Sequence, residues 1–388
     1  MSLLQKSGRL LCSLRLTVAL LGLGMVLIFV ATIAQVEIGI REAQLRYFRS
    51  WIAWLEVGPG TLRVSLPLPG GLLLASVLLV NLLAAHLTRF KLQWKKAGIF
   101  LIHTGVLLLL LGELFTALLG WEAQIRLDEG ETLNYSTHPW EVELVIIDSS
   151  APGEDSVTAI PQSRLRAGAV FPLDGFTVRI ERFLPNSEIV PAATAGPEFE
   201  APRATKGPGV AFAVREVPEE TAPDRRNLCS AFVEIIPEHG SAPGRWLLSN
   251  AISGMQEFKI GDALLTMAIR QRRFYHPFSI TLLDFSHDRY LGTEIPKNFS
   301  SRIRIMNADR GEDRETLIYM NHPLRYGGLT FYQSGFDNDD TTSIIQVVRN
   351  PAWTLPYIAC AMVALGLLWV FSQHLVKAIG RRRAEHAS

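Results

Sequence analysis

Four apolar stretches, each close to the length that a helix needs to cross a lipid bilayer, divide this chain of 388 residues. They run from Leu16 to Ala34, from Gly71 to Leu87, from Gly98 to Leu119 and from Trp353 to Ser372. A hydrocarbon core about 30 Å thick needs about 20 apolar helical residues, so the second stretch is near the lower limit. Because backbone polar groups in lipid must be satisfied internally, each stretch is predicted to be a transmembrane helix.

The first stretch also has two features of a cleaved signal peptide, a basic start and the sequence ATIAQ at its end. It is longer than the usual core of a signal peptide, so a retained helix is favoured. The three later stretches predict a membrane-embedded chain under either interpretation.

Basic residues predict the direction of the crossings. Clusters of lysine and arginine precede the first stretch, fill the link between the second and third, and follow the fourth. The positive-inside rule therefore places both termini in the cytoplasm and the long segment after the third helix outside it. The expected divisions are 1–34 (tail and first helix), 35–70 (outer loop), 71–88 (second helix), 89–97 (cytoplasmic link), 98–119 (third helix), 120–351 (outer domain), 352–373 (fourth helix) and 374–388 (cytoplasmic tail).

The remaining composition excludes several classes of protein. The net charge is only +1, and no basic stripe with interleaved aromatic residues is present, so nucleic-acid binding is not predicted. The three cysteines, Cys12, Cys229 and Cys360, form no CxxC pair, which excludes thioredoxin-like chemistry and a cysteine zinc site. Cys229 is expected to be buried and unreactive, with a free thiol or an intermolecular disulfide as the alternatives.

The outer loop contains aromatic residues at spacings of three and four, Tyr47, Phe48, Trp51 and Trp54. This spacing suits an amphipathic helix in the headgroup zone. A lid that contacts a ligand remains compatible with the same pattern.

The outer domain is predicted to be mostly β. Six segments alternate or run apolar with β-branched residues and are separated by turn residues: EVELVIID, FTVRIERF, GVAFAVRE, SAFVEIIPE, DALLTMAIRQ and SSRIRIM. Glycine and proline cluster between Pro191 and Gly209, which predicts an exposed loop. With no fixed repeat, an antiparallel sandwich or open barrel is the expected fold.

This domain shows no recognisable catalytic motif. It contains no HExxH, GxSxG or phosphate-binding glycine loop. His138, His276 and His322 each precede a proline and are predicted to be turn residues rather than metal ligands.

The third apolar stretch carries His103 inside it and Glu113 near its end. An imidazole in hydrocarbon needs a partner, and such residues are rare and often functional. On residue type alone, His103 is equally compatible with a metal ligand and with a hydrogen bond to a neighbouring helix. His86, at the end of the second stretch, can extend its ring to the interface.

Four segments together resemble the ResB (CcsB) proteins of the system II cytochrome c biogenesis pathway. They are MNHPLRYGGLTFYQSGF (320–336), FSITLLDFSHDRYLGTEIPKNFSSRIRI (278–305), AGIFLIHTGVLLLLLGE (97–113) and WEAQIRLDEGET (121–132). The resemblance covers the four-helix plan and the C-terminal half of the outer domain, and it leaves out residues 149–248.

The resemblance implies a protein of the bacterial inner membrane, with its large domain in the periplasm, that handles b-type haem. Such proteins pair with a CcsA (ResC) protein, export haem and attach it to CxxCH motifs of apocytochrome c, as part of a haem lyase or synthetase complex. This chain lacks a tryptophan-rich run, so it is similar to the ResB half only. His103 matches the transmembrane histidine thought to ligate the iron, and His86 is a candidate haem neighbour.

Two alternatives stay open at this stage. The first is a membrane scaffold without cofactor, whose extracytoplasmic β domain organises a complex. The second is a cytochrome b-like electron carrier, which requires paired histidines on facing helices, and His86 with His103 is a poor candidate pair.

Overall fold

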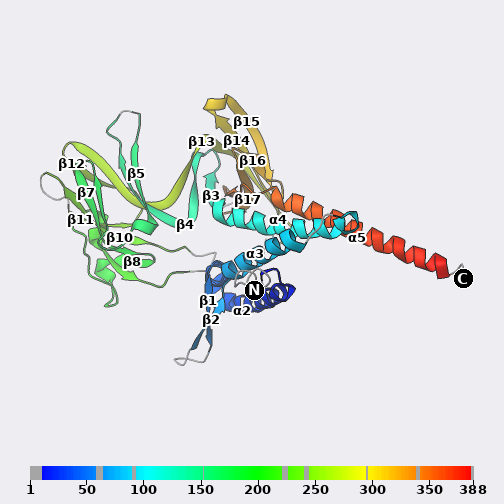
Figure 1. The fold of residues 1–388 in the computed structure, drawn as a ribbon. Helices are drawn as coiled ribbons and strands as arrows, with labels where there is room; N and C mark the ends of the chain where they lie inside the picture. The colour runs from blue at the N-terminus through cyan, green and yellow to red at the C-terminus, as the bar shows by residue number, and fades with distance from the viewer. Residues whose placement is uncertain are drawn as a thin grey trace. The chain divides into compact units, whose positions relative to one another are not determined.

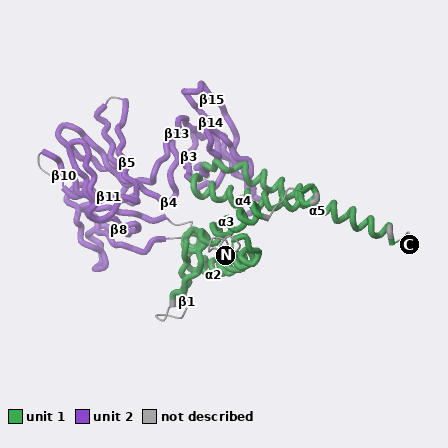
Figure 2. Tube along the Cα trace, viewed as in Figure 1, with its two compact units in different colours: residues 1–121, 221–223, 349–388 green, residues 122–220, 224–348 purple. Residues whose placement is uncertain are grey.

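The computed structural model describes residues 11–57, 64–89, 93–151, 153–220, 226–239, 244–293, 296–337 and 341–385. It divides into two compact units (Figure 2). The helical unit comprises residues 1–121, 221–223 and 349–388, and the β unit comprises residues 122–220 and 224–348.

The helical unit contains the four predicted crossings. They are α2 (Leu14–Ala43), α3 (Gly71–Arg89), α4 (Ala97–Leu119) and α5 (Leu355–Glu385). All four are long and apolar enough to span a membrane. The short helix η2 (Trp94–Lys96) leads into α4, and α2 and α5 are both longer than the apolar stretches from which they were predicted.

Helices α2 and α3 are joined by a buried polar contact. Asn81 on α3 is fully buried, and the Thr17 hydroxyl donates to its Oδ1 at 2.6 Å. The Asn81 amide nitrogen in turn donates to the carbonyl oxygen of Leu11 at 2.6 Å. A satisfied amide between apolar helices stabilises their association, because the alternative is a bare polar group in hydrocarbon.

Helices α4 and α5 approach closely along a seam of glycines. Gly98, Gly105 and Gly112 recur every seven residues of α4 and are buried. A Cβ on Gly98 would lie 2.7 Å from the carbonyl oxygen of Gly366, and one on Gly105 would lie 2.8 Å from that of Ala359. Small residues at such spacing let two backbones meet. The seam therefore defines the face of α4 that is turned to α5.

The aromatic segment differs from the predicted amphipathic helix. Helix α2 kinks at Gly39, whose φ of 77° favours glycine, and continues as the π-helix η1 (Gln44–Phe48). The chain then forms a hairpin of β1 (Ile52–Val57) and β2 (Val64–Pro69), so Trp54 lies in a strand. The helix expected through Trp54 ends earlier because residues 52–57 pair with residues 64–69, which bury Ala53 completely.

The β unit is built from antiparallel strands, as predicted. They are β3 (Trp121–Asp128), β4 (Thr132–Asp148), β5 (Ser156–Pro161), β6 (Val170–Leu173), β7 (Phe176–Leu184), β8 (Ser187–Pro191), β9 (Phe212–Glu216), β10 (Ser230–Pro237), β11 (Gly244–Ser249), β12 (Gln256–Ile260), β13 (Ala263–Arg289), β14 (Pro296–Asn307), β15 (Glu312–Tyr319), β16 (Leu324–Tyr326), β17 (Leu329–Phe336) and β18 (Thr342–Arg349). All six segments predicted as strands contribute to one.

The largest sheet nearly closes into a barrel. Its order is β15-β14-β13-β4-β3-β18-β17-β16, and β12 and β5 pair with β13 and β4. A bridge between Tyr319 and His322 brings the end of β15 back towards β16. A second sheet has the order β11-β10-β7-β6, and β8 pairs with β9. The predicted fold class, four membrane helices with a β-rich sandwich or open barrel, is confirmed.

The long strands β4 and β13 belong to the largest sheet, and their residues also contribute to an apolar core shared with the second sheet (Figure 1). This core includes Leu144, Ile180 and Val233, all with no exposed surface. Among the buried residues of the barrel are Leu282 and Phe331, also fully buried. Burial of large aliphatic and aromatic side chains is the dominant favourable term in folding. Buried side chains therefore stabilise both the barrel and the second sheet.

Candidate functional site

His103 lies on the side of α4 that is turned away from α5. It precedes Gly105 by two residues, which in an α-helix is a rotation of about 200° from the glycine seam. Its side chain is exposed on the surface of the helical unit. The sequence-predicted ligand therefore lies on an exposed face of α4 and is not enclosed between α4 and α5.

The His103 ring is oriented by its own helix. Its Nδ1 lies 2.8 Å from the carbonyl oxygen of Ile99. Because a carbonyl oxygen can only accept, Nδ1 carries the hydrogen, and in the neutral ring the lone pair is on Nε2. Histidines that ligate a metal commonly donate their other ring N–H to a backbone carbonyl in this way. This arrangement fits a residue that would ligate a metal through Nε2.

His86 connects α3 to α4 beside this position. Its ring centroid lies 4.8 Å from that of Phe100, and its Nε2 lies 3.2 Å from the Thr104 hydroxyl oxygen. That hydroxyl donates its hydrogen to the Phe100 carbonyl at 2.9 Å. The hydroxyl oxygen therefore accepts from His86, which carries its hydrogen on Nε2. His86 packs half-buried against α4 instead of extending to the interface as expected.

The contacts of His86 bring the two predicted histidines to the same stretch of helix. Phe100 and Thr104, which contact His86, lie on either side of His103 in the sequence of α4. Sequence reasoning missed Thr104, although its hydroxyl, adjacent to His103, was a readable signal. It also missed the seven-residue glycine spacing that decides which face of α4 stays open.

Other polar groups of the helical unit lie apart from this pair. Glu113 and His374 are exposed on α4 and α5. Over the described parts of the chain, no group of three or more histidine, cysteine, aspartate or glutamate side chains could hold a metal ion. A haem iron needs only one or two axial protein ligands, since the porphyrin supplies the rest.

The histidines of the β unit have local structural roles. His138 Nδ1 accepts hydrogen bonds from the backbone N–H groups of Trp140, at 3.2 Å, and Glu141, at 2.8 Å. His276 stacks on Phe278 with 5.1 Å between centroids. His138 and His276 lie in β4 and β13 rather than in turns, next to shifts in strand register, where proline interrupts the ladder.

Cys229 is buried and unreactive, as expected. Only 2% of its surface is exposed, and burial raises the pKa of its thiol to about 12. The thiolate, which is the nucleophile and the metal ligand, is therefore suppressed at neutral pH.

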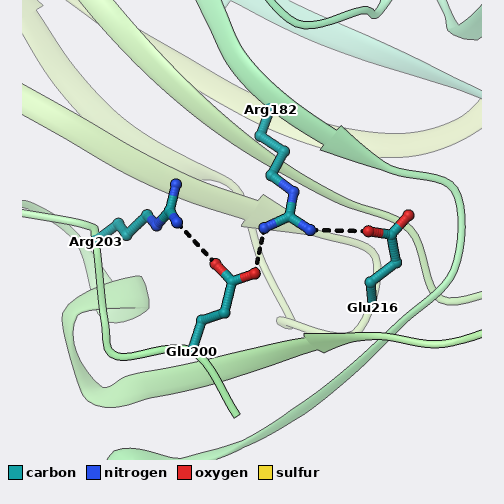
Figure 3. A network of polar contacts seen from close by, with 4 residues as sticks. All are labelled: Arg182, Glu200, Arg203 and Glu216. Carbon is teal, nitrogen blue, oxygen red and sulfur yellow. Dashed lines mark hydrogen bonds and ion pairs between the residues drawn. The ribbon is translucent and has the colours of Figure 1, made fainter. Parts of the chain in front are cut away.

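A network of ion pairs holds the proline- and glycine-rich loop to the β unit (Figure 3). Arg182 on β7 binds Glu200 in the loop and Glu216 on β9, and Arg203 lies 3.0 Å from Glu200. These carboxylates raise the pKa of the Arg182 guanidinium, Glu200 most strongly. Every charge in the network is paired with a charge of opposite sign. The ion pairs therefore fix the loop in place. Arg126 is likewise paired, with Asp337.

The architecture is typical of a membrane protein, with four helices long and apolar enough to span a bilayer and a large β-rich domain. Residues 249–352, from the end of β11 to the start of α5, match the ResB-like family. The chain is thus a ResB/CcsB-like protein, as the sequence motifs indicated.

Two curated relatives agree with the family match. Protein NrfI of Wolinella succinogenes is 25% identical over 302 residues, which cover 76% of this chain and 29% of NrfI. The cytochrome c biogenesis protein CcsB of Crocosphaera subtropica is 28% identical over 113 residues, which cover 29% of this chain and 24% of CcsB. The chain thus spans less than a third of the length of either relative. Together they support a role in cytochrome c biogenesis.

Proposed function

We propose that this chain is the ResB-like subunit of a system II cytochrome c maturation complex. It helps to export haem across the inner membrane and to deliver it to apocytochrome c, together with a CcsA (ResC)-type membrane protein. The ResB-like match of residues 249–352 supports the pathway, and the position of His103 supports the handling of haem.

The observation that carries the proposal is an oriented imidazole on the open face of a membrane helix. Ionisable residues within membrane helices are rare and often mark functional sites. The Ile99 carbonyl accepts from Nδ1 of His103, so the lone pair of the neutral ring lies on Nε2, the nitrogen that would ligate the iron.

Haem bound here would supply an iron, which the neutral imidazole of His103 would ligate. The chain's own residues prepare the site. Ile99 orients the His103 ring, and Phe100 and Thr104 hold His86 beside it. His103 lies in the second turn of α4, about 8 Å from the expected cytoplasmic end of the crossing. This depth suits collection of haem from the inner leaflet.

The orientation follows from the basic clusters. Lys96 precedes α4, while Lys377, Arg381, Arg382 and Arg383 lie in the last part of α5. The positive-inside rule places these residues in the cytoplasm. Both termini are then cytoplasmic, and the β unit lies in the periplasm, where apocytochrome c receives its haem.

The test is an absorption spectrum of the chain co-purified with its CcsA-type partner. We expect a b-type haem spectrum from the unaltered pair and a loss of most of the haem from His103→Ala. External imidazole should partly restore haem delivery, because it replaces the missing ligand. His374→Ala, an exposed histidine on α5, is the matched control and should keep its haem.

Unchanged haem content in His103→Ala would remove this residue from the mechanism. If that variant also assembled normally with the partner and supported cytochrome c maturation, the scaffold function would be the better description. If His103→Ala instead failed to form the complex, this face of α4 would be needed for assembly. The haem content of the separately purified chains would then distinguish a role in assembly from a role in haem ligation.

A further inference from the structure

Helix α5 is longer than the membrane is thick. It has 31 residues, from Leu355 to Glu385, and is therefore about 46 Å long. A hydrocarbon core of about 30 Å accommodates about 20 of these residues. With Leu355 at one boundary, the other boundary falls near Gln373, and the rest of the helix extends into the headgroup region and beyond. Figure 1 shows α5 continuing past the start of α4.

A cavity of about 480 Å³ lies at this second boundary. The described residues that line it are Trp369, Ser372, Gln373, Val376 and Lys377. Their spacings of three, four, seven and eight place them on one face of α5. The cavity begins one turn beyond Gly366, where α5 still packs against Gly98 at the start of α4.

The lining has an apolar part and a polar, cationic part. Trp369 and Val376 offer apolar surface, and 69% of Val376 is exposed. Ser372 offers a hydroxyl group, and Lys377 offers an ammonium group. Along membrane helices, tryptophan is common at the edge of the hydrocarbon, and lysine extends into the headgroup layer.

The helix beyond the cavity is strongly basic. Arg381, Arg382 and Arg383 follow Lys377, and Glu385 is the one carboxylate between residues 369 and 385. Leu375 and Ile379 are exposed among these cations. A basic helical segment with apolar side chains attracts anionic lipid.

We propose that this cavity on α5 is a binding site for an anionic phospholipid. The phosphate group binds Lys377, with Ser372 as a hydrogen-bonding neighbour, and one acyl chain lies against Trp369 and Val376. A free phosphate ion would use only the polar part of the cavity. The apolar part is what selects a lipid, and it lies at the depth where the acyl chains begin.

The test uses the full-length chain in phosphatidylcholine nanodiscs with increasing fractions of phosphatidylglycerol. The phosphatidylglycerol carries bromine on acyl carbons near the headgroup, which quenches the fluorescence of adjacent tryptophan. We expect a saturable component of the quenching that Trp369→Phe removes, and an apparent affinity of that component that Lys377→Gln lowers about fivefold, the effect of one cation near an anionic surface. Lys377→Arg should retain the affinity.

Arg383→Gln is the matched control, because it removes one positive charge from the same helix outside the cavity. It should change the affinity much less than Lys377→Gln. Equal effects of the two variants would show general attraction to a charged surface and would overturn the proposal. So would equal quenching by brominated phosphatidylcholine, or displacement of the lipid by millimolar inorganic phosphate.

Discussion

At the scale of single residues, the histidines of this chain differ in the partners that hold them. His103 donates to a carbonyl of its own helix, and His86 donates to a hydroxyl of the next helix. His276 in the β unit contacts the Ser136 hydroxyl at 3.0 Å and stacks on Phe278. Burial lowers the pKa of His276, because the protonated ring loses its hydration. One residue type therefore serves as candidate ligand, as a connector between helices and as a half-buried residue of the β unit.

The His276 environment predicts a pH dependence of stability. A folded-state pKa below the unfolded value means that the unfolded chain binds the proton more readily. The stabilising effect of the neutral ring is present above the unfolded value of about 6.5 and is lost as the pH falls below it. We expect the thermal unfolding temperature of the β unit to fall between pH 7 and pH 5. His276→Gln should reduce this fall, and an unchanged pH profile in that variant would contradict the assignment.

At the scale of elements, the closest helix contact is the glycine seam between α4 and α5. Each of the three glycines occupies a place where a side chain would meet α5. The seam positions α4 so that His103 is on the open side. The candidate site therefore depends on residues that never contact it.

A single added methyl group should disturb this seam. In Gly105→Ala, the new Cβ would lie 2.7 Å from Val363 Cγ2 and 2.8 Å from the Ala359 carbonyl oxygen. Overpacking of this kind costs about 1–3 kcal/mol. We expect a lower unfolding temperature in detergent and faster maleimide labelling of the exposed Cys360 on α5. Gly22→Ala is the control, because nothing lies within 4 Å of its new Cβ; equal behaviour of the two variants would rule out tight packing at the seam.

At the scale of the whole molecule, the β unit has the features of an independently folding domain. It contains complete sheets and large buried clusters, which β4 and β13 join. The segment matched to the ResB-like family lies almost entirely within it, whereas the candidate haem ligand lies in the helical unit. Membrane and domain functions can therefore be tested separately.

We expect a fragment of residues 122–348 to fold without the helices. Its sole cysteine is Cys229, which is buried in the intact chain. A folded fragment should give a β-type circular dichroism spectrum and label slowly with maleimide until denaturant is added, because the thiol is inaccessible. Immediate labelling in buffer, at the rate seen in denaturant, would show that the β unit needs the helical unit to fold.

The sequence by itself determined the four crossings and most of the strands. Both follow from local composition and period, since about 20 apolar residues in succession have no stable alternative to a membrane helix and alternating β-branched runs favour half-buried strands. The PLRYGGLTFYQS segment and its neighbours were sufficient to indicate the ResB-like family. The aromatic loop was not predictable in this way, because pairing between residues 52–57 and 64–69 overrode a helical spacing.

Only the tertiary structure decided that His103 lies on an exposed side of α4. His103 was identifiable from its residue type and position, but its exposure depends on glycines that pack against α5, more than 240 residues later in the chain. The same holds for His86, which contacts Phe100 and Thr104 only because α3 and α4 lie side by side. The spacing of residues along one helix determines which side chains share a face. Which neighbour covers that face is determined by how the other helices pack.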